Sequence, residues 1–299
     1  MIRTLTAMSL VLVLNSQDAS AERLVEHLGP RALAMGEAGR ADAKGASATV
    51  LNPAGLALDR RLLFSASYGY RDTDGASIAA VSACDSTVPV PGCFYYKYLN
   101  GDSGIDGIDG KRRLHEFGSS FSRVLSQQLA FGITARYFDY NSDITGDQDE
   151  SGYATDAGLI FTVASLRIAA VGHNLIGSDA TSYPRGFGTG LSFAPGGPLT
   201  VSVDSLWNLE LEDDQKSGRF GGGVEYLVGG QDGLSSYPIR FGGVFDRASD
   251  EGYLNFGIGL ASAKLGLNIG GRKQVSGGGD ELIIQVGLNL VGAVPQAGR

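Results

Sequence analysis

Apolar side chains occupy every second position in a series of segments between Arg61 and Val291, each roughly ten residues long. In the clearest of them, residues 128–140, the apolar set comprises Leu129, Phe131, Ile133, Ala135 and Tyr137. Successive side chains of a strand point to opposite faces, so this period places the apolar and polar sets on opposite sides of a sheet. A soluble β-sandwich has the same period. Long strands with a polar, glycine-rich second face, behind a secretion signal, favour a transmembrane antiparallel β-barrel that is apolar outside and polar within.

The alternation predicts fourteen strands in one barrel. They span 61–71, 76–83, 93–100, 112–124, 128–140, 152–163, 165–175, 184–194, 199–210, 217–228, 237–247, 252–260, 264–272 and 281–291. The second and third segments alternate least, and without them the count is twelve.

Connection lengths support the even strand count. Bacterial barrels have short periplasmic turns and longer outer loops. With the N-terminus in the periplasm, the connections follow that rule along most of the chain. Two longer segments, between Cys84 and Cys93 and at 229–236, fall on the periplasmic side. A missed strand would explain either one, but not both without changing the parity between them.

Charged residues within the predicted strands fall on the face opposite the apolar stripe. These predicted lumen charges are Arg136, Asp156, Arg167, Asp204, Glu225, Arg240 and Lys264. Arg136 and Asp156 lie on adjacent strands, as do Glu225 and Arg240. Pairing would neutralise charge buried against a plug, because an isolated charge in a dry lumen is costly. The same residues would equally suit the wall of a wet, weakly selective channel.

The N-terminal residues differ from the barrel region. Residues 1–21 have the features of a secretory signal peptide, with Arg3 before a short apolar core and small residues at 19–21. Residues 22–60 lack the alternation and are rich in Ala and Gly, which predicts a compact segment of short helices and turns. The predicted organisation is therefore signal peptide, N-terminal segment, barrel over 61–291 and a C-terminal tail at 292–299.

Composition excludes other classes of protein. The net charge of −8 argues against nucleic acid as a partner. A mean hydropathy of +0.01 is far below that of a helical membrane protein, and beyond the N-terminus no run reaches the length of roughly 18 apolar residues that a membrane helix needs.

Two cysteines, Cys84 and Cys93, flank a proline-rich turn. In an exported protein this spacing predicts a local disulfide, and a pair of free or metal-binding thiols is the alternative.

The sequence offers no catalytic constellation. His27, His115 and His173 are widely spaced, and none stands beside a Ser or Cys nucleophile. The glycine-rich stretch at 221–230 lacks the Lys-Ser/Thr of a phosphate-binding loop. We therefore expect neither an enzyme nor a cofactor or metal site.

The stretch Ala32–Leu58 resembles the N-terminal region of the FadL superfamily, which includes transporters of fatty acids and aromatic hydrocarbons. The matching positions are Met35-Gly36-Glu37-Ala38, Ala41-Asp42, Ala46-Ser47-Ala48-Thr49 and Asn52-Pro53-Ala54-Gly55-Leu56. The resemblance implies a fourteen-stranded barrel in the outer membrane whose lumen is plugged by an N-terminal hatch, and it places Asn52, Pro53, Ala54 and Gly55 in that hatch. Alternatively, Asn52 and Pro53 merely shape the turn before the first strand.

The resemblance implies passive transport of small hydrophobic molecules such as fatty acids, with outer-membrane lipid and a hydrophobic ligand as partners. The chain departs from the transporters in its short outer loops, which leave no large apolar groove for capturing a substrate. This departure favours an alternative function, a non-transporting barrel that docks or anchors an envelope or secretion complex. A pair of soluble periplasmic β-sandwiches is a third interpretation.

Overall fold

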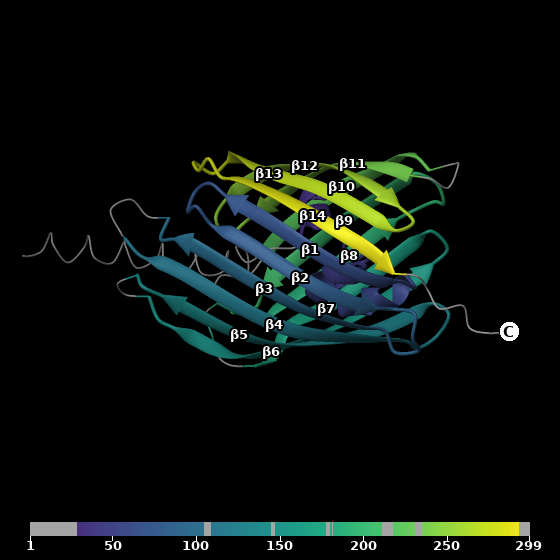
Figure 1. Ribbon diagram of the computed structural model, residues 1–299, viewed down its shortest axis with the longest axis horizontal. Coiled ribbons are helices and arrows are strands. Elements are labelled where there is room, and N and C mark those ends of the chain that lie inside the picture. The colour runs from purple at the N-terminus through teal and green to yellow at the C-terminus, as the bar shows by residue number, and fades with distance from the viewer. Residues whose placement is uncertain are drawn as a thin grey trace, which may run out of the picture.

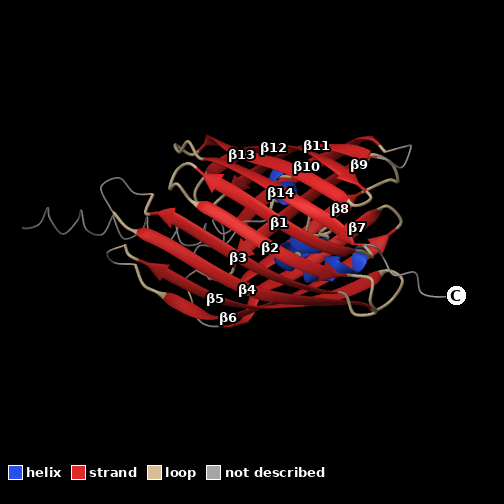
Figure 2. Ribbon diagram, in the orientation of Figure 1, coloured by secondary structure: helices blue, strands red, loops and turns tan. Residues whose placement is uncertain are grey.

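Fourteen antiparallel strands form one closed barrel (Figures 1 and 2). The computed structural model describes residues 29–104, 109–144, 147–177, 180, 182–210, 218–230 and 235–292. The predicted signal peptide and the tail beyond residue 292 lie outside these residues. The strands are β1 (Leu62–Arg71), β2 (Ser77–Asp85), β3 (Gly92–Asp102), β4 (Lys111–Val124), β5 (Leu129–Ser142), β6 (Glu150–Val163), β7 (Leu166–Gly177), β8 (Gly186–Phe193), β9 (Leu199–Asn208), β10 (Gly218–Gly229), β11 (Ser235–Asp246), β12 (Glu251–Ser262), β13 (Leu265–Ser276) and β14 (Leu282–Gly292). The prediction of fourteen strands is confirmed, and the two weakest segments are β2 and β3.

The first and last strands close the barrel. Leu62 of β1 pairs with Gly292 of β14 on one side and with Asp85 of β2 on the other. A bilayer offers no water to an open sheet edge, so a closed ring of strands satisfies the backbone where an open sheet would not. In the described residues, no helix is long and apolar enough to cross a membrane.

The two connections that departed from the expected lengths each join strands that pair directly. Residues 86–91 join β2 to β3, and β10 pairs with β11. Cys84 and Cys93 stand directly opposite each other on β2 and β3, and a disulfide joins them.

The two faces of the wall follow the alternation. On β5, Phe131, Ile133, Ala135 and Tyr137 are exposed, while Gly132, Thr134 and Arg136 between them are buried. The exposed apolar side chains of β14 are Ile284, Val286, Leu288 and Leu290. The outer surface is therefore the apolar one, as a membrane-spanning barrel requires.

Short helices fill part of the lumen (Figure 2). They are α3 (Pro30–Ala34), η1 (Gly45–Ser47), α4 (Ala48–Leu51) and η2 (Pro53–Leu58). We call residues 29–60, which contain them, the hatch. Its backbone lies against the wall at inward-facing glycines: a Cβ at Gly223 would collide with the backbone of Met35, and one at Gly132 with that of Pro53 and Ala54. Small residues on both sides thus allow close contact.

We call the two ends of the barrel the loop end, where odd-numbered strands finish, and the turn end, where even-numbered strands finish. The residues that close the turn end near β1–β3 are mainly apolar. This buried cluster comprises Ala32, Ala43, Ala48, Leu51, Leu56, Cys84 and Cys93, with Leu63 against it.

An arginine at Val203 tests the orientation of the faces. Val203 lies midway along β9 and its side chain is 50% exposed. Val203→Arg should lower the free energy of unfolding by about 2–4 kcal/mol, because the guanidinium would point into the bilayer core. Leu199→Arg, at the end of the same strand, should cost about 0–1 kcal/mol. Urea unfolding in lipid vesicles measures both, and equal costs would contradict the assigned faces.

Candidate functional site: the hatch within the lumen

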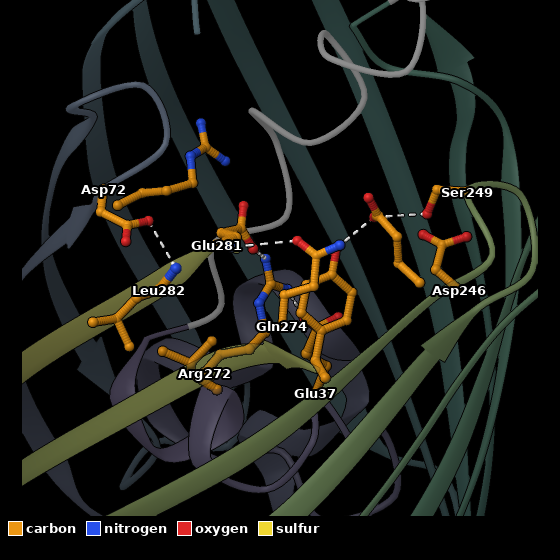
Figure 3. A network of polar contacts seen from close by, with 12 residues as sticks. Glu37, Asp72, Asp246, Ser249, Arg272, Gln274, Glu281 and Leu282 are labelled. Carbon is orange, nitrogen blue, oxygen red and sulfur yellow. Dashed lines mark hydrogen bonds and ion pairs between the residues drawn. The ribbon is translucent and has the colours of Figure 1, made fainter. Parts of the chain in front are cut away.

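The carboxylate of Glu37 anchors the hatch to two distant strands. It accepts hydrogen bonds from Arg219 of β10, at 2.8 Å, and from Arg272 of β13 (Figure 3). Each arginine also reaches a second carboxylate, Asp246 for Arg219 and Glu281 for Arg272, both at 2.6 Å. All of these residues are largely buried, and each charge lies beside at least one opposite charge within one network.

The same contacts keep Glu37 ionised. Burial alone would raise the pKa of this carboxyl, but the two guanidinium groups of Arg219 and Arg272 outweigh it and lower the pKa to about 2. Glu37 therefore carries a negative charge at any pH near neutrality.

Arg31 and Asp42 form a second anchor. Arg31 lies 2.9 Å from Asp42 within the hatch and 2.9 Å from Glu225 of β10. Glu225 is in turn 2.6 Å from Arg240 of β11, so this predicted lumen pair is bridged to the hatch. Asp42 also accepts a hydrogen bond from Arg167 of β7. Burial opposes the ionisation of Asp42, but the surrounding cations, Arg31 first among them, lower its pKa.

Asp204 of β9 holds the hatch backbone directly. Its carboxylate accepts hydrogen bonds from the backbone N–H groups of Gly39 and Arg40, both at 2.8 Å, and from the Arg40 guanidinium at 3.2 Å. Charge-assisted bonds of this kind are roughly twice as strong as those between neutral groups. The hatch is thus held by a further strand, next to β10.

The pair of Arg136 and Asp156 belongs to the wall itself. Asp156 pairs with Arg136 of β5, and it also contacts the His173 ring at 3.2 Å and the backbone N–H of Asn174 at 2.9 Å. The pairing of β6 with β7 is irregular at this point, and Asn174 has a φ of 53°. The carboxylate therefore accepts a hydrogen bond from a backbone N–H group at a point where the strand pairing is irregular.

Asn52 contacts both the hatch and the barrel wall. Its side-chain oxygen accepts a hydrogen bond from the Ala54 N–H at 3.1 Å, which begins η2. Its side-chain nitrogen donates to the carbonyl of Leu159 on β6 at 3.1 Å. Pro53, Ala54 and Gly55 are buried with it in the lumen.

The assignment of Lys264 to the lumen is wrong. The residue lies in the exposed turn between β12 and β13, because β13 begins one residue later than the alternation suggested. Sequence reasoning also missed the hatch charges that hold the plug, namely Arg31, Glu37, Arg40 and Asp42. The only signal was the presence of charged residues in a segment otherwise made mainly of small and apolar residues.

A small open cavity lies between the hatch and the inner faces of β1–β3 and β14. Small side chains line it, including Ser65 and Ser82 from the wall and Thr49 from the hatch. The side-chain oxygens of Ser65, Ser82 and Gln285 are buried and have no hydrogen-bond partner among the described residues. Such groups need water or a polar ligand atom to be satisfied.

A buried apolar cluster lies inside the barrel towards the loop end. Its members are Ile78, Leu99, Leu114, Phe138, Tyr140, Ala154, Ala180 and Tyr183. The alternation predicted a polar lumen. Bulky apolar residues nevertheless face inward on β2–β6, so the lumen is not uniformly polar. Ile78 also lines the cavity beside the hatch, so the two regions adjoin.

Solved structures with the same architecture are known. The monoaromatic hydrocarbon channel CymD superposes with a TM-score of 0.67 at 10% identity, covering 89% of this chain and 97% of that one. The Pseudomonas putida toluene transporter TodX gives 0.61 at 11% identity, covering 87% and 96%. A Pseudomonas aeruginosa FadL homologue gives 0.60 at 8% identity, covering 88% and 98%.

The chain has the fold of the FadL-type outer-membrane barrels. No protein-family profile and no curated protein sequence matches it. At identities near 10% the similarity concerns the FadL-type fold alone, and the hatch seen in the lumen is where the family resemblance of Ala32–Leu58 placed it.

Removing the charge of Glu37 should loosen the hatch. We expect Glu37→Gln to lower the free energy of unfolding by about 3 kcal/mol, the low end for breaking a buried pair, because each arginine keeps its second carboxylate. Asp143→Asn is the matched control. The ion pair of Asp143 with Arg113 is exposed, and its loss should cost about 0–1 kcal/mol. Equal effects in urea unfolding would show that the Glu37 network does not hold the hatch.

The contribution of Glu37 should depend on pH. Because its pKa falls from 4.5 to about 2 in the folded state, its stabilisation is complete above pH 4.5 and declines as the pH falls towards 2. The difference in unfolding free energy between the wild type and Glu37→Gln should therefore be smaller at pH 3 than at pH 6. A difference that grows on acidification would contradict this assignment.

Proposed function

We propose that the protein is an outer-membrane channel for the passive transport of small hydrophobic molecules, with the hatch as its gate. The carrying observation is the order of features along the lumen. The apolar cluster lies towards the loop end, the cavity adjoins it at Ile78, and the hatch lies against the cavity. CymD is a monoaromatic hydrocarbon channel and TodX is a toluene transporter. Their common fold with this chain supports the same substrate class here.

The proposed route begins at the loop end. A hydrophobic molecule gains roughly 25 cal/mol for each Å² of apolar surface that it removes from water, so the apolar cluster favours its uptake. From there it reaches the cavity, where small wall residues leave space. The hatch then blocks the turn end, where Leu51 and Leu56 belong to a second apolar cluster. The hatch must therefore shift before the molecule can continue.

The non-transporting alternative also has an observation in its favour. The hatch is held by charged contacts from β7, β9, β10 and β13. Removing one partner of a buried ion pair strongly destabilises a protein, because the other charge is left buried and unpaired. A barrel whose plug never moves would suit the docking or anchoring of an envelope complex. Transport requires these contacts to open without unfolding the wall, and uptake measurements separate the two functions.

Uptake of labelled toluene into cells that carry the protein in their outer membrane tests transport. We expect faster uptake than in cells without the protein, and a further increase for Gly223→Val, since the new side chain would displace the hatch at Met35. Gly222→Val is the control, because a Cβ at Gly222 meets only ordinary contacts on the outer side, at Val203. Correctly inserted protein that leaves uptake unchanged would reject transport, and co-purification with an envelope complex would then support docking.

A further inference from the structure

Tyr183 occupies an aromatic site inside the barrel. It belongs to the connection between β7 and β8, yet its ring stacks on Phe138 of β5, with centroids 4.0 Å apart and planes inclined by 20°. Both rings are buried. Leu99 and Leu114 belong to the same apolar cluster. A residue from a connecting segment thus fills a space whose walls are strand residues.

The tyrosine hydroxyl meets a buried carboxylate. It donates a hydrogen bond to one oxygen of Glu116 on β4. The other oxygen of Glu116 accepts a hydrogen bond from the hydroxyl of Tyr95 at 2.8 Å. It also lies 3.5 Å from the ammonium group of Lys97. Glu116 is 1% exposed. The wall therefore places a charged hydrogen-bond acceptor beside the hydroxyl of the ring that stacks on Phe138.

These residues form a site that we call the phenol slot: Phe138, Leu99, Leu114 and Glu116. Its stacking surface, aliphatic walls and single acceptor complement a flat ring with one hydroxyl. A pure hydrocarbon would fill the apolar part but leave one oxygen of Glu116 without a donor. An unsatisfied buried group of this kind makes a site discriminate against the ligand that lacks the hydroxyl.

The occupant and the slot belong to different parts of the fold. The slot residues lie on paired strands, whereas Tyr183 lies on the connection between β7 and β8. The neighbouring Ser182 bonds Glu150 through its N–H and its hydroxyl, at 3.1 and 2.6 Å, and Asn174 donates to the carbonyl of Pro184 at 2.7 Å. Because Tyr183 lies outside the strands, removal of its side chain from the slot would leave the strand pairing unchanged.

We propose that the phenol slot is a binding site for hydroxylated monoaromatic molecules, and that Tyr183 is an internal ligand which an incoming phenol replaces. Such a ligand reproduces both the stack on Phe138 and the hydrogen bond to Glu116. Through Ile78 the cluster around the slot adjoins the cavity beside the hatch. The inference rests on the proposed channel function for its physiological meaning, but binding itself is independent of transport.

Binding of p-cresol and toluene to the full-length barrel in detergent tests the proposal, because the two ligands differ by one hydroxyl. By titration calorimetry, Tyr183→Ala should bind p-cresol at least about tenfold more tightly than the wild type, since the competing internal ligand is gone. The gain for toluene should be smaller. Adding Glu116→Gln to Tyr183→Ala should reduce the preference for p-cresol, because an amide accepts a weaker hydrogen bond than a carboxylate.

Tyr153→Ala is the matched control, because Tyr153 is a tyrosine of the neighbouring strand β6 that faces outward and is 69% exposed. It should bind both ligands as the wild type does. Folded Tyr183→Ala that shows no gain over this control, or an equal gain for both ligands, would overturn the phenol slot and leave Tyr183 a structural residue.

A second variant covers failure of Tyr183→Ala to fold. Tyr183→Phe keeps the stacked ring but loses the bond to Glu116, so p-cresol should bind more tightly than to the wild type, and an unchanged affinity would overturn the proposal. The channel function fails separately: loss of uptake with intact p-cresol binding rejects transport only, and loss of binding with intact uptake rejects the slot only.

Discussion

Closure of the sheet is the constraint on which the rest of the structure depends. A bilayer core offers no hydrogen bonds, so every strand must pair on both sides, and the pairing of β1 with β14 completes the ring. Closure also creates an interior. Whatever faces inward is enclosed by the wall, and in this chain the hatch occupies part of that interior. The charges, glycines and apolar clusters of the lumen are all consequences of filling that enclosed space.

Two kinds of contact fix the hatch within the ring. Inward glycines such as Gly132 and Gly223 let its backbone approach the wall closely. Ion pairs then set its position, because Glu37, Asp42 and their arginine partners are buried with their charges balanced. At Glu37 this arrangement both holds the hatch and allows its release, because Arg219 and Arg272 keep Asp246 and Glu281 as partners when the hatch leaves.

The two halves of the lumen differ in chemistry. The hatch contacts are mainly ionic, whereas the region towards the loop end on β2–β6 contains a buried apolar cluster beside the buried carboxylate of Glu116. An apolar region suits a hydrophobic molecule arriving from outside, and an ionic one suits a plug that must be held. The inward position of Tyr183 connects these features, since it satisfies Glu116 and covers the apolar surface at once.

The sequence by itself determined the strands, their number and their faces, because alternation is a property of neighbouring residues. It also brought Glu225 and Arg240 together, since adjacent antiparallel strands place them directly opposite. Only the tertiary structure decided which wall residues meet the hatch. Glu37 and Arg272 are 235 residues apart, and no local pattern joins them. Tyr183 and Lys264 lie outside the strands, where periodicity carries no information, so their positions depend on how the closed barrel arranges its connections in space.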